Sequence, residues 1–156
     1  VYTKNKDTVG GTPYEIRKTD TFLRNWKKNP DRYPLIIKGA RQVGKTETIR
    51  KFAKENYKNL VEINFITEPA YKTIIDEGFS ADNILKLISR IDPSKHFDAG
   101  ETLLFFDEIQ DFPEIATSLK FFKENGKYDV ICSGSLLGVQ YHRIASISVG
   151  YKTDYQ

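Results

Sequence analysis

Cysteine, methionine and long apolar runs are scarce or missing in this 156-residue chain, and each shortage excludes something. The single cysteine, Cys132, rules out an internal disulfide framework and favours a reducing compartment, so we expect a cytoplasmic protein. No run of about 18 apolar residues occurs, which argues against a membrane-spanning helix and a membrane partner. The polar start, VYTKNKDTVGG, lacks the apolar segment of a signal peptide. Because the chain starts with Val1 and contains no methionine, we expect a fragment or a processed form.

Net charge is also small, at +3, but its two signs are unevenly placed. Residues 1–60 hold 15 Lys and Arg against 6 Asp and Glu, whereas residues 61–156 hold 9 against 15. A basic half can attract a partner that carries phosphate, such as a nucleic acid. The plainer interpretation is that these charges lie on solvated helix faces, and the sequence leaves both interpretations open.

Short apolar runs alternate with amphipathic segments along the chain. Hydrophobic residues make up 39% of it and aromatic residues 13%, which suffices for one packed domain. The runs predicted as strands are 35–37, 60–66, 102–108 and 128–134, with a short fifth near 147–150. The segments predicted as helices are 19–28, 46–57, 70–79, 82–91 and one that starts near 113 and ends before 126. Strands that are apolar throughout are typical of a parallel sheet, so we predict an α/β domain, with an extension at 1–18 and the core at 19–156.

Three residues indicate where helices begin or end. Asp82 is predicted as the N-cap of the helix over 82–91. Pro113 suits the first turn of the last predicted helix, and Gly126 suits its C-terminal end.

The stretch GARQVGKT, residues 39–46, fits the pattern G-x-x-x-x-G-K-[ST] of a phosphate-binding loop. An apolar run precedes it and an amphipathic helix follows it, which is the context that such a loop requires. Its N–H groups can turn inward around phosphate, and the following helix adds the positive end of its dipole. Lys45 is predicted to reach the β- and γ-phosphates, and Thr46 to bind Mg²⁺ through its hydroxyl. The predicted nucleotide-binding residues are Gly39, Ala40, Arg41, Gln42, Val43, Gly44, Lys45 and Thr46.

Two adjacent acids end the apolar run LLFFDEIQ, residues 103–110. Asp107 is predicted to hold Mg²⁺, and Glu108, pointing to the other side if the strand continues, to polarise an attacking water as general base. This pair favours ATP hydrolysis over two other reactions. A GTPase needs N-K-x-D after its loop, but the only Asn-Lys here is Asn5-Lys6, upstream of it. A small-molecule kinase needs an acceptor pocket and no acid that activates water.

The stretch VICSGSLLG, residues 130–138, places Ser133 and Ser135 where the fourth predicted strand ends. Taken in order, GARQVGKT, LLFFDEIQ and VICSGSLLG resemble the "predicted AAA+ superfamily" of bacterial and archaeal P-loop ATPases. The later stretch HRIASISVGYKTDY is similar to the segment that follows in that family. The resemblance extends from about Phe22 to the end of the chain.

The resemblance implies a three-layer fold whose parallel sheet has the strand order 5-1-4-3-2, with ATP and Mg²⁺ as cofactors. It implies phosphate-loop roles for Lys45 and Thr46, a metal role for Asp107, a catalytic base in Glu108 and a γ-phosphate sensor in Ser133, with Ser135 as second candidate. Members of the family continue into a lid and a C-terminal domain that are absent here, so we expect this chain to be truncated before them. The arginine finger stays unassigned, with Arg143 as the candidate.

Several other residues have two interpretations each. Gln110 either orients water or starts a loop, and Tyr14 and Ile16 either line an adenine pocket or pack in the core. The predicted core residues are Trp26 and Cys132, and the predicted loop residues without a catalytic role are His96 and His142.

The sequence thus predicts a Mg-dependent ATPase that binds ATP and ADP. The alternative is an ATP-gated module that binds DNA or a protein and hydrolyses little. Phosphotransfer to a small molecule is a third hypothesis. The oligomeric state and the biological process stay open.

Overall fold

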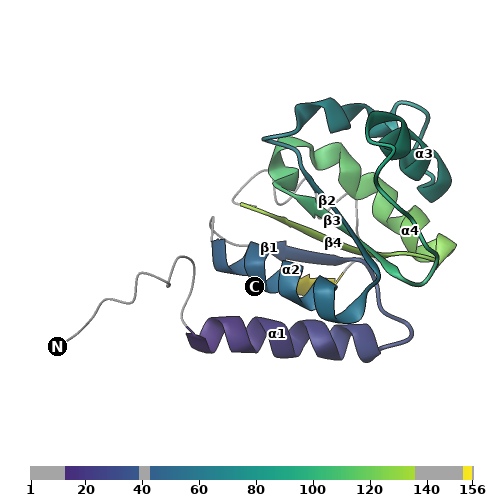
Figure 1. The fold of residues 1–156 in the computed structure, drawn as a ribbon. Helices are drawn as coiled ribbons and strands as arrows, with labels where there is room; N and C mark the ends of the chain where they lie inside the picture. The colour runs from purple at the N-terminus through teal and green to yellow at the C-terminus, as the bar shows by residue number, and fades with distance from the viewer. Residues whose placement is uncertain (1–12, 39–42, 136–152, 156) are drawn as a thin grey trace.

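The computed structural model describes residues 13–38, 43–135 and 153–155, and shows a sheet between two layers of helices (Figure 1). The α-helices are α1 (Pro13–Lys28), α2 (Val43–Asn56), α3 (Ala81–Ile91) and α4 (Leu119–Asn125). The strands are β1 (Leu35–Lys38), β2 (Asn59–Asn64), β3 (Thr102–Asp107), β4 (Asp129–Gly134) and β5 (Thr153–Tyr155). Three short 3₁₀ helices, η1 (Pro69–Ile75), η2 (Ile109–Asp111) and η3 (Pro113–Ser118), complete the described elements.

All five described strands are parallel and follow the order β2-β3-β4-β1-β5. This order is the predicted 5-1-4-3-2, and the α/β class with helices on both faces is confirmed. The described fifth strand lies at Thr153–Tyr155, whereas the range predicted for it, 147–150, lies outside the described residues. Strand β4 therefore sits between the strand that feeds the phosphate loop and the strand that ends in the acid pair.

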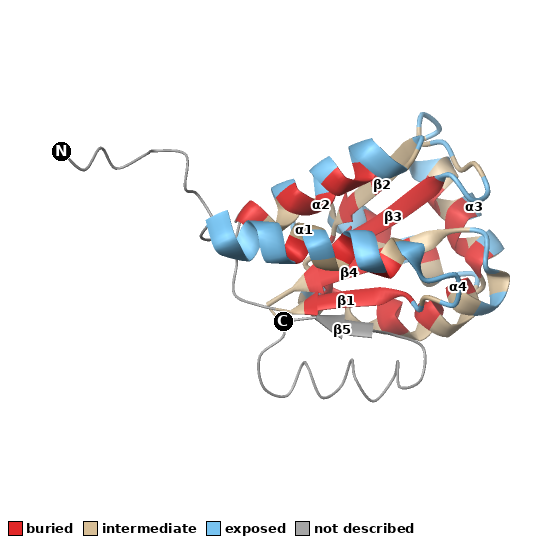
Figure 2. Ribbon diagram, turned by 90° about the horizontal axis from the view of Figure 1, so that it is seen from below, coloured by how far each residue is buried: buried red, intermediate tan, exposed pale blue. Residues whose placement is uncertain are grey.

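Each sheet face has its own hydrophobic core, because successive residues of a strand point to opposite faces. On β3, Leu103 and Phe105 pack with α1 and α2, whereas Leu104 and Phe106 pack with α3, α4 and the 3₁₀ helices. Figure 2 shows this burial on the strands and on the inner sides of the helices. Every residue of β3 is buried, as the continuous apolar run predicts.

Helix α1 begins at Pro13, six residues before the predicted start at residue 19. Residues 13–18 are all exposed, so they add no apolar periodicity from which a helix could be predicted. Proline nevertheless suits the first turn, where its missing N–H costs no hydrogen bond. The predicted division between 1–18 and 19–156 therefore falls inside this helix, and the division itself stays a prediction.

Two other predicted boundaries are wrong for identifiable reasons. The N-cap of α3 is Ser80, whose side chain accepts a 3.2 Å hydrogen bond from Asn83 N, and Asp82 lies in the first turn instead. Strand β2 ends at Asn64 rather than at residue 66, because Asn64 Oδ1 accepts hydrogen bonds from the N–H groups of Ile66 and Thr67 and turns the chain.

The helix predicted over 70–79 is the 3₁₀ helix η1, which ends at Ile75. The final predicted helix is η3 followed directly by α4. Pro113 opens η3, and Gly126 caps α4 with φ of 69°, so the predictions for these two residues are confirmed.

Candidate nucleotide-binding site

The carboxyl ends of β1, β3 and β4 meet at one edge of the sheet, where open α/β sheets bind ligands. Asp107 continues the alternation of Leu103 and Phe105, and Ser133 continues that of Ile131, so both belong to the face covered by α2. Ser133 Oγ donates a 2.7 Å hydrogen bond to Asp107 Oδ1. Two of the predicted site residues, 26 positions apart in sequence, are thereby brought into contact.

Asp107 is a buried carboxylate, and its environment pulls its pKa in two directions. Burial raises the pKa, while the hydrogen bonds from Ser133 Oγ and from the N–H of Glu108 act to lower it; the net shift is upward. Both hydrogen bonds go to Oδ1, and no described residue donates one to Oδ2. A cation near Oδ2 would favour the charged form and reverse the effect of burial.

Lys45 reaches back to the strand that precedes the phosphate loop. Its Nζ donates a 2.9 Å hydrogen bond to the carbonyl of Lys38, the last residue of β1. Burial lowers the pKa of Lys45, and the charge of Glu15 on α1 acts against that shift. Because Lys38 is in register with Gly134 of β4, the ammonium group lies at the strand edge that also carries Ser133 and Asp107.

The N-terminus of α2 lies within the phosphate-loop sequence, three residues before the predicted start at residue 46. The helix begins at Val43, and Thr46 lies half-buried in its first turn. Thr48 Oγ1 donates a 2.6 Å hydrogen bond to the carbonyl of Gly44, which ties this turn together. The remaining predicted loop residues, Gly39, Ala40, Arg41 and Gln42, lie outside the described residues.

Strand β3 ends at Asp107, so the strand geometry from which the position of Glu108 was predicted does not extend to it. Glu108 has φ of 56° and is the one residue other than glycine with positive φ in the described part of the chain. This left-handed conformation costs about 1–2 kcal/mol for a residue with a Cβ, and such strain clusters at functional sites. The chain turns at once into η2, where Asp111 N donates a 3.1 Å hydrogen bond to the Glu108 carbonyl.

Gln110 is the residue whose position the sequence left open. It lies on η2 rather than in an irregular loop, and its Nε2 donates a hydrogen bond to Glu108 Oε2. A spacing of two residues cannot predict this contact, because in an extended strand the two side chains would be about 7 Å apart along the chain.

The other singled-out residues have mixed outcomes. Trp26 and Cys132 are core residues with 7% and 0% exposure, and burial raises the pKa of the Cys132 thiol. Tyr14 and Ile16 are 68% and 39% exposed on α1, so the core-packing alternative is wrong for them, and the adenine role stays a prediction. His96 lies in a described loop, as predicted, whereas His142 and Arg143 lie outside the described residues.

The donor set fits Mg²⁺ with a nucleotide better than a metal held by protein alone. Among the described residues, no group of three or more His, Cys, Asp or Glu could hold a metal ion. Mg²⁺ commonly takes one or two protein oxygens and completes its shell with phosphate and water. Asp107 Oδ2 and the hydroxyl of Thr46 are the oxygens for such an ion, and Lys45 with the N-terminus of α2 suits the phosphates.

A family model described as "AAA domain" matches residues 31–156, which is most of the chain. The chain belongs to the AAA domain family. The matched range includes the phosphate-loop sequence, the acid pair and the end of β4. The match supports the resemblance to AAA+ P-loop ATPases, while the bacterial or archaeal origin stays a prediction. No curated protein sequence gives a significant match.

Solved AAA+ structures share the fold of this chain at low sequence identity. The ORC1 protein of Aeropyrum pernix in complex with DNA gives a TM-score of 0.54 at 11% identity, over 96% of this chain and 46% of that chain. PCH-2 of C. elegans gives 0.56 at 8% identity, over 97% and 45%. Hsp104 with ATPγS and FITC-casein gives 0.51 at 18% identity, over 96% and 27%. The chain therefore spans less than half of the length of these three proteins.

Family and fold together support a nucleotide-binding domain of the ATPase type. Within the described residues, no helix is long and apolar enough to cross a membrane.

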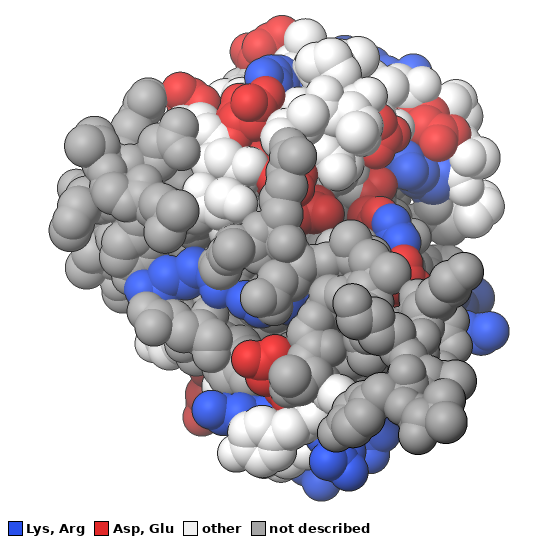
Figure 3. All heavy atoms as spheres, turned by 90° about the vertical axis from the view of Figure 1, so that its left-hand side faces the viewer, with Lys and Arg blue, Asp and Glu red and all other residues white. Residues whose placement is uncertain are grey.

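Figure 3 views the edge where β1, β3 and β4 end: acidic side chains gather in its upper half, and basic side chains form a band below them.

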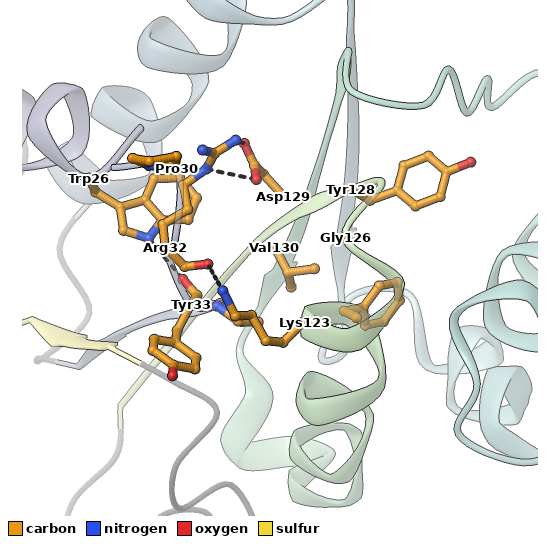
Figure 4. A pocket seen from close by; sticks show the side chains of 11 residues that line it. Trp26, Pro30, Arg32, Tyr33, Lys123, Gly126, Tyr128, Asp129 and Val130 are labelled. Atoms are coloured by element: carbon orange, nitrogen blue, oxygen red, sulfur yellow. Dashed lines mark hydrogen bonds and ion pairs between the residues drawn. The ribbon is translucent and has the colours of Figure 1, made fainter. Parts of the chain in front are cut away.

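A second pocket lies at the opposite edge of the sheet, where β1 and β4 begin (Figure 4). Its polar groups are paired with one another. Arg32 donates hydrogen bonds of 2.9 and 2.8 Å to the two carboxylate oxygens of Asp129, and Lys123 Nζ donates to the carbonyls of Asp31 and Arg32. These pairs explain the pocket as a structural junction between the loop over 29–34, α4 and β4.

Proposed function

We propose that this chain is a Mg-dependent ATPase domain. The observation that carries the proposal is the hydrogen bond from Ser133 to Asp107 on the sheet face that α2 covers. This hydrogen bond joins the stretch LLFFDEIQ to the stretch VICSGSLLG. Lys45 of the third stretch, GARQVGKT, contacts the Lys38 carbonyl at the same edge of the sheet.

Binding would rest on Lys45, Thr46 and Asp107. Lys45 would exchange its hydrogen bond to the Lys38 carbonyl for hydrogen bonds to phosphate oxygens. The new acceptor would be charged, whereas the carbonyl is neutral. Thr46 and Asp107 would hold the cation between them. When bound, Mg·ATP supplies the γ-phosphoryl group and a metal that neutralises its charge.

Ser133 and Glu108 would act beside the γ-phosphate. The hydroxyl of Ser133 has one proton, which goes to Asp107 here, so Ser133 cannot donate to a phosphate oxygen in the same state. In this state it orients the predicted metal ligand, and a sensor role would require the hydroxyl to rotate. Glu108 would accept the proton of an attacking water.

Phosphate release from Mg·ATP tests the proposal, with the wild type compared to Glu108→Gln and nucleotide binding measured in parallel. We expect the wild type to release phosphate, and the variant to bind ATP equally well but release at least 100-fold less, since a positioned base contributes roughly 10²–10⁴-fold. Binding without release in both proteins would instead support the switch hypothesis. ADP formation that requires an added acceptor, without release of free phosphate, would support phosphotransfer. Failure to bind ATP would contradict the nucleotide site.

The second candidate is an ATP-gated module that binds DNA or a protein. It is favoured by the exposed basic residues of one helical layer, namely Arg17, Lys18, Arg24 and Lys28 on α1, with Lys51 and Lys54 on α2. A solved structure of similar fold is titled as an ORC1 protein in complex with DNA. Phosphate contacts by this layer would make DNA binding weaken steeply with salt. Binding that is weak and independent of salt would contradict this candidate.

A further inference from the structure

Gln110 is held at one end of its amide and unpaired at the other. Its Nε2 donates to Glu108 Oε2, whereas its Oε1 is buried and accepts no hydrogen bond from a described residue. A buried amide oxygen without a donor is unfavourable, so its position needs a cause. The reversed amide would set Oε1 against the Glu108 carboxylate, where both groups only accept. The contact with Glu108 therefore decides how the amide is oriented.

Gly134 provides the space in which this amide lies. A Cβ at Gly134 would collide with Gln110 Oε1 and would stand 3.1 Å from the backbone N of Ile109. Gly134 is not among the glycines with positive φ, so its backbone conformation does not itself require glycine. What the position needs is the absence of a side chain.

The same strand end carries the predicted binding groups. Gly134 follows Ser133, which donates to Asp107, and it is in register with Lys38, whose carbonyl accepts from Lys45. Gln110 thus connects the Glu108 carboxylate to the end of β4.

We propose that Gln110 is a positioning residue that fixes the Glu108 carboxylate through its side-chain N–H, and that Gly134 leaves the space in which the Gln110 amide lies. The inference rests on the proposed ATPase function, in which Glu108 is the base. With one carboxylate oxygen held by Gln110, the other is kept in a defined place for water. Loss of this restraint leaves Glu108 free to rotate, which lowers kcat and leaves nucleotide affinity unchanged.

The first test detects the contact without turnover, from the side-chain amide resonance of Gln110 in ¹⁵N-labelled protein free of nucleotide. The resonance is assigned by its loss in Gln110→Met. We expect it to shift in Glu108→Ala, which removes the acceptor, and in Gly134→Ala, which displaces the amide. Asp111→Asn is the matched control. Asp111 lies beside Gln110 on η2, and its substitution removes only an exposed ion pair with Lys72. A resonance that shifts in neither variant, or equally in the control, overturns the proposal.

The second test separates kcat from affinity. Gln110→Met keeps the length of the side chain, and we expect kcat to fall about tenfold at unchanged ATP affinity. Gly134→Ala should give the same loss, and the double variant should be no slower, since both changes remove one contact. Asp111→Asn should match the wild type. Unchanged or raised kcat in Gln110→Met, or additive losses, overturns the proposal.

The two tests keep this inference distinct from the function on which it rests. A wild type that releases no phosphate contradicts the proposed ATPase. The Gln110 resonance in that protein still shows whether the amide is fixed between Glu108 and Gly134, and an unfixed amide overturns the positioning role by itself.

Discussion

Ser133 Oγ lies 2.7 Å from Asp107 Oδ1 and gives its one proton to that oxygen. The two residues lie at the carboxyl ends of neighbouring parallel strands and point to the same sheet face. Because Asp107 is buried, this bond and the one from the N–H of Glu108 oppose the effect of burial on the carboxylate. Loss of the hydrogen bond from Ser133 is therefore predicted to affect the binding of the metal rather than the binding of the nucleotide.

Ser133→Ala should weaken Mg²⁺ binding without abolishing nucleotide binding. Loss of a hydrogen bond to a charged group costs about 1.5–3 kcal/mol, so we expect the Mg²⁺ concentration for half-maximal ATP binding to rise about tenfold or more. Titration of Mg²⁺ against a fluorescent ATP analogue measures it. The control is Ser89→Ala, which removes a serine hydrogen bond to the Leu85 carbonyl within α3. An unchanged Mg²⁺ requirement would refute the assignment of Asp107 as metal ligand.

Lys45→Met should weaken ATP binding about 10–100-fold, the equivalent of roughly 1.5–3 kcal/mol for a charge-assisted hydrogen bond. The fold should survive, since the Lys38 carbonyl loses a hydrogen bond at an edge that ligand or water can reach. Lys51→Met, on an exposed position of the same helix, is the matched control. Calorimetric titration of ATP compares the two, and equal affinities would contradict a phosphate-binding Lys45.

Asp129→Asn should destabilise the fold without affecting nucleotide binding. Asp129 accepts hydrogen bonds from Nε and Nη2 of Arg32 and from Tyr57 Oη, the last at 2.5 Å, and 15% of its side chain is exposed. Burial and the neighbouring Asp129 raise the pKa of Tyr57, so the phenol stays a donor.

Removal of one carboxylate oxygen leaves part of this network unpaired, at about 2 kcal/mol. Urea unfolding of the nucleotide-free protein measures the cost. Glu77→Gln removes a carboxylate that pairs with Lys86 and Arg90 on the surface, and it should leave the midpoint nearly unchanged. Equal effects of the two substitutions would mean that the Asp129 network contributes no more to the stability of the fold than surface ion pairs do.

Cys132 should be unreactive in the folded protein. It is fully buried in β4, and burial raises the pKa of its thiol, so almost no thiolate is exposed to reagent at neutral pH. Reaction with Ellman's reagent should proceed only as urea unfolds the chain, with one thiol appearing along the unfolding transition. Rapid reaction in buffer would show that β4 opens locally.

The fold was predictable wherever one pattern decided the structure. The continuous apolar run before Asp107 can be buried only between two helical layers, and the glycine motif fixes the order strand, loop, helix. These features allowed the positions of Lys45 and Asp107 at one edge of the sheet to be predicted, while the roles assigned to Lys45, Thr46, Asp107 and Ser133 stay predictions. The strand order itself came from the family resemblance.

Predictions failed where tertiary contacts or local hydrogen bonds override periodicity. Residues 13–18 form a helix without burying an apolar face, so no helical spacing of apolar residues predicts it. Ser80 competes with Asp82 for the cap, and both are good cap residues. The turn at Glu108 depends on a positive φ that no local residue type demands, so the contact between Gln110 and Glu108 could not be predicted.

Single-turnover cleavage of ATP tests the central claim most directly, with protein in excess over γ-labelled ATP and Mg²⁺ present. Under these conditions the chemical step is observed without product release. We predict that the wild type converts the bound ATP to ADP and phosphate, and that Glu108→Gln retains it as ATP. Cleavage at equal rates in both proteins, or bound ATP that the wild type never cleaves, would contradict the account.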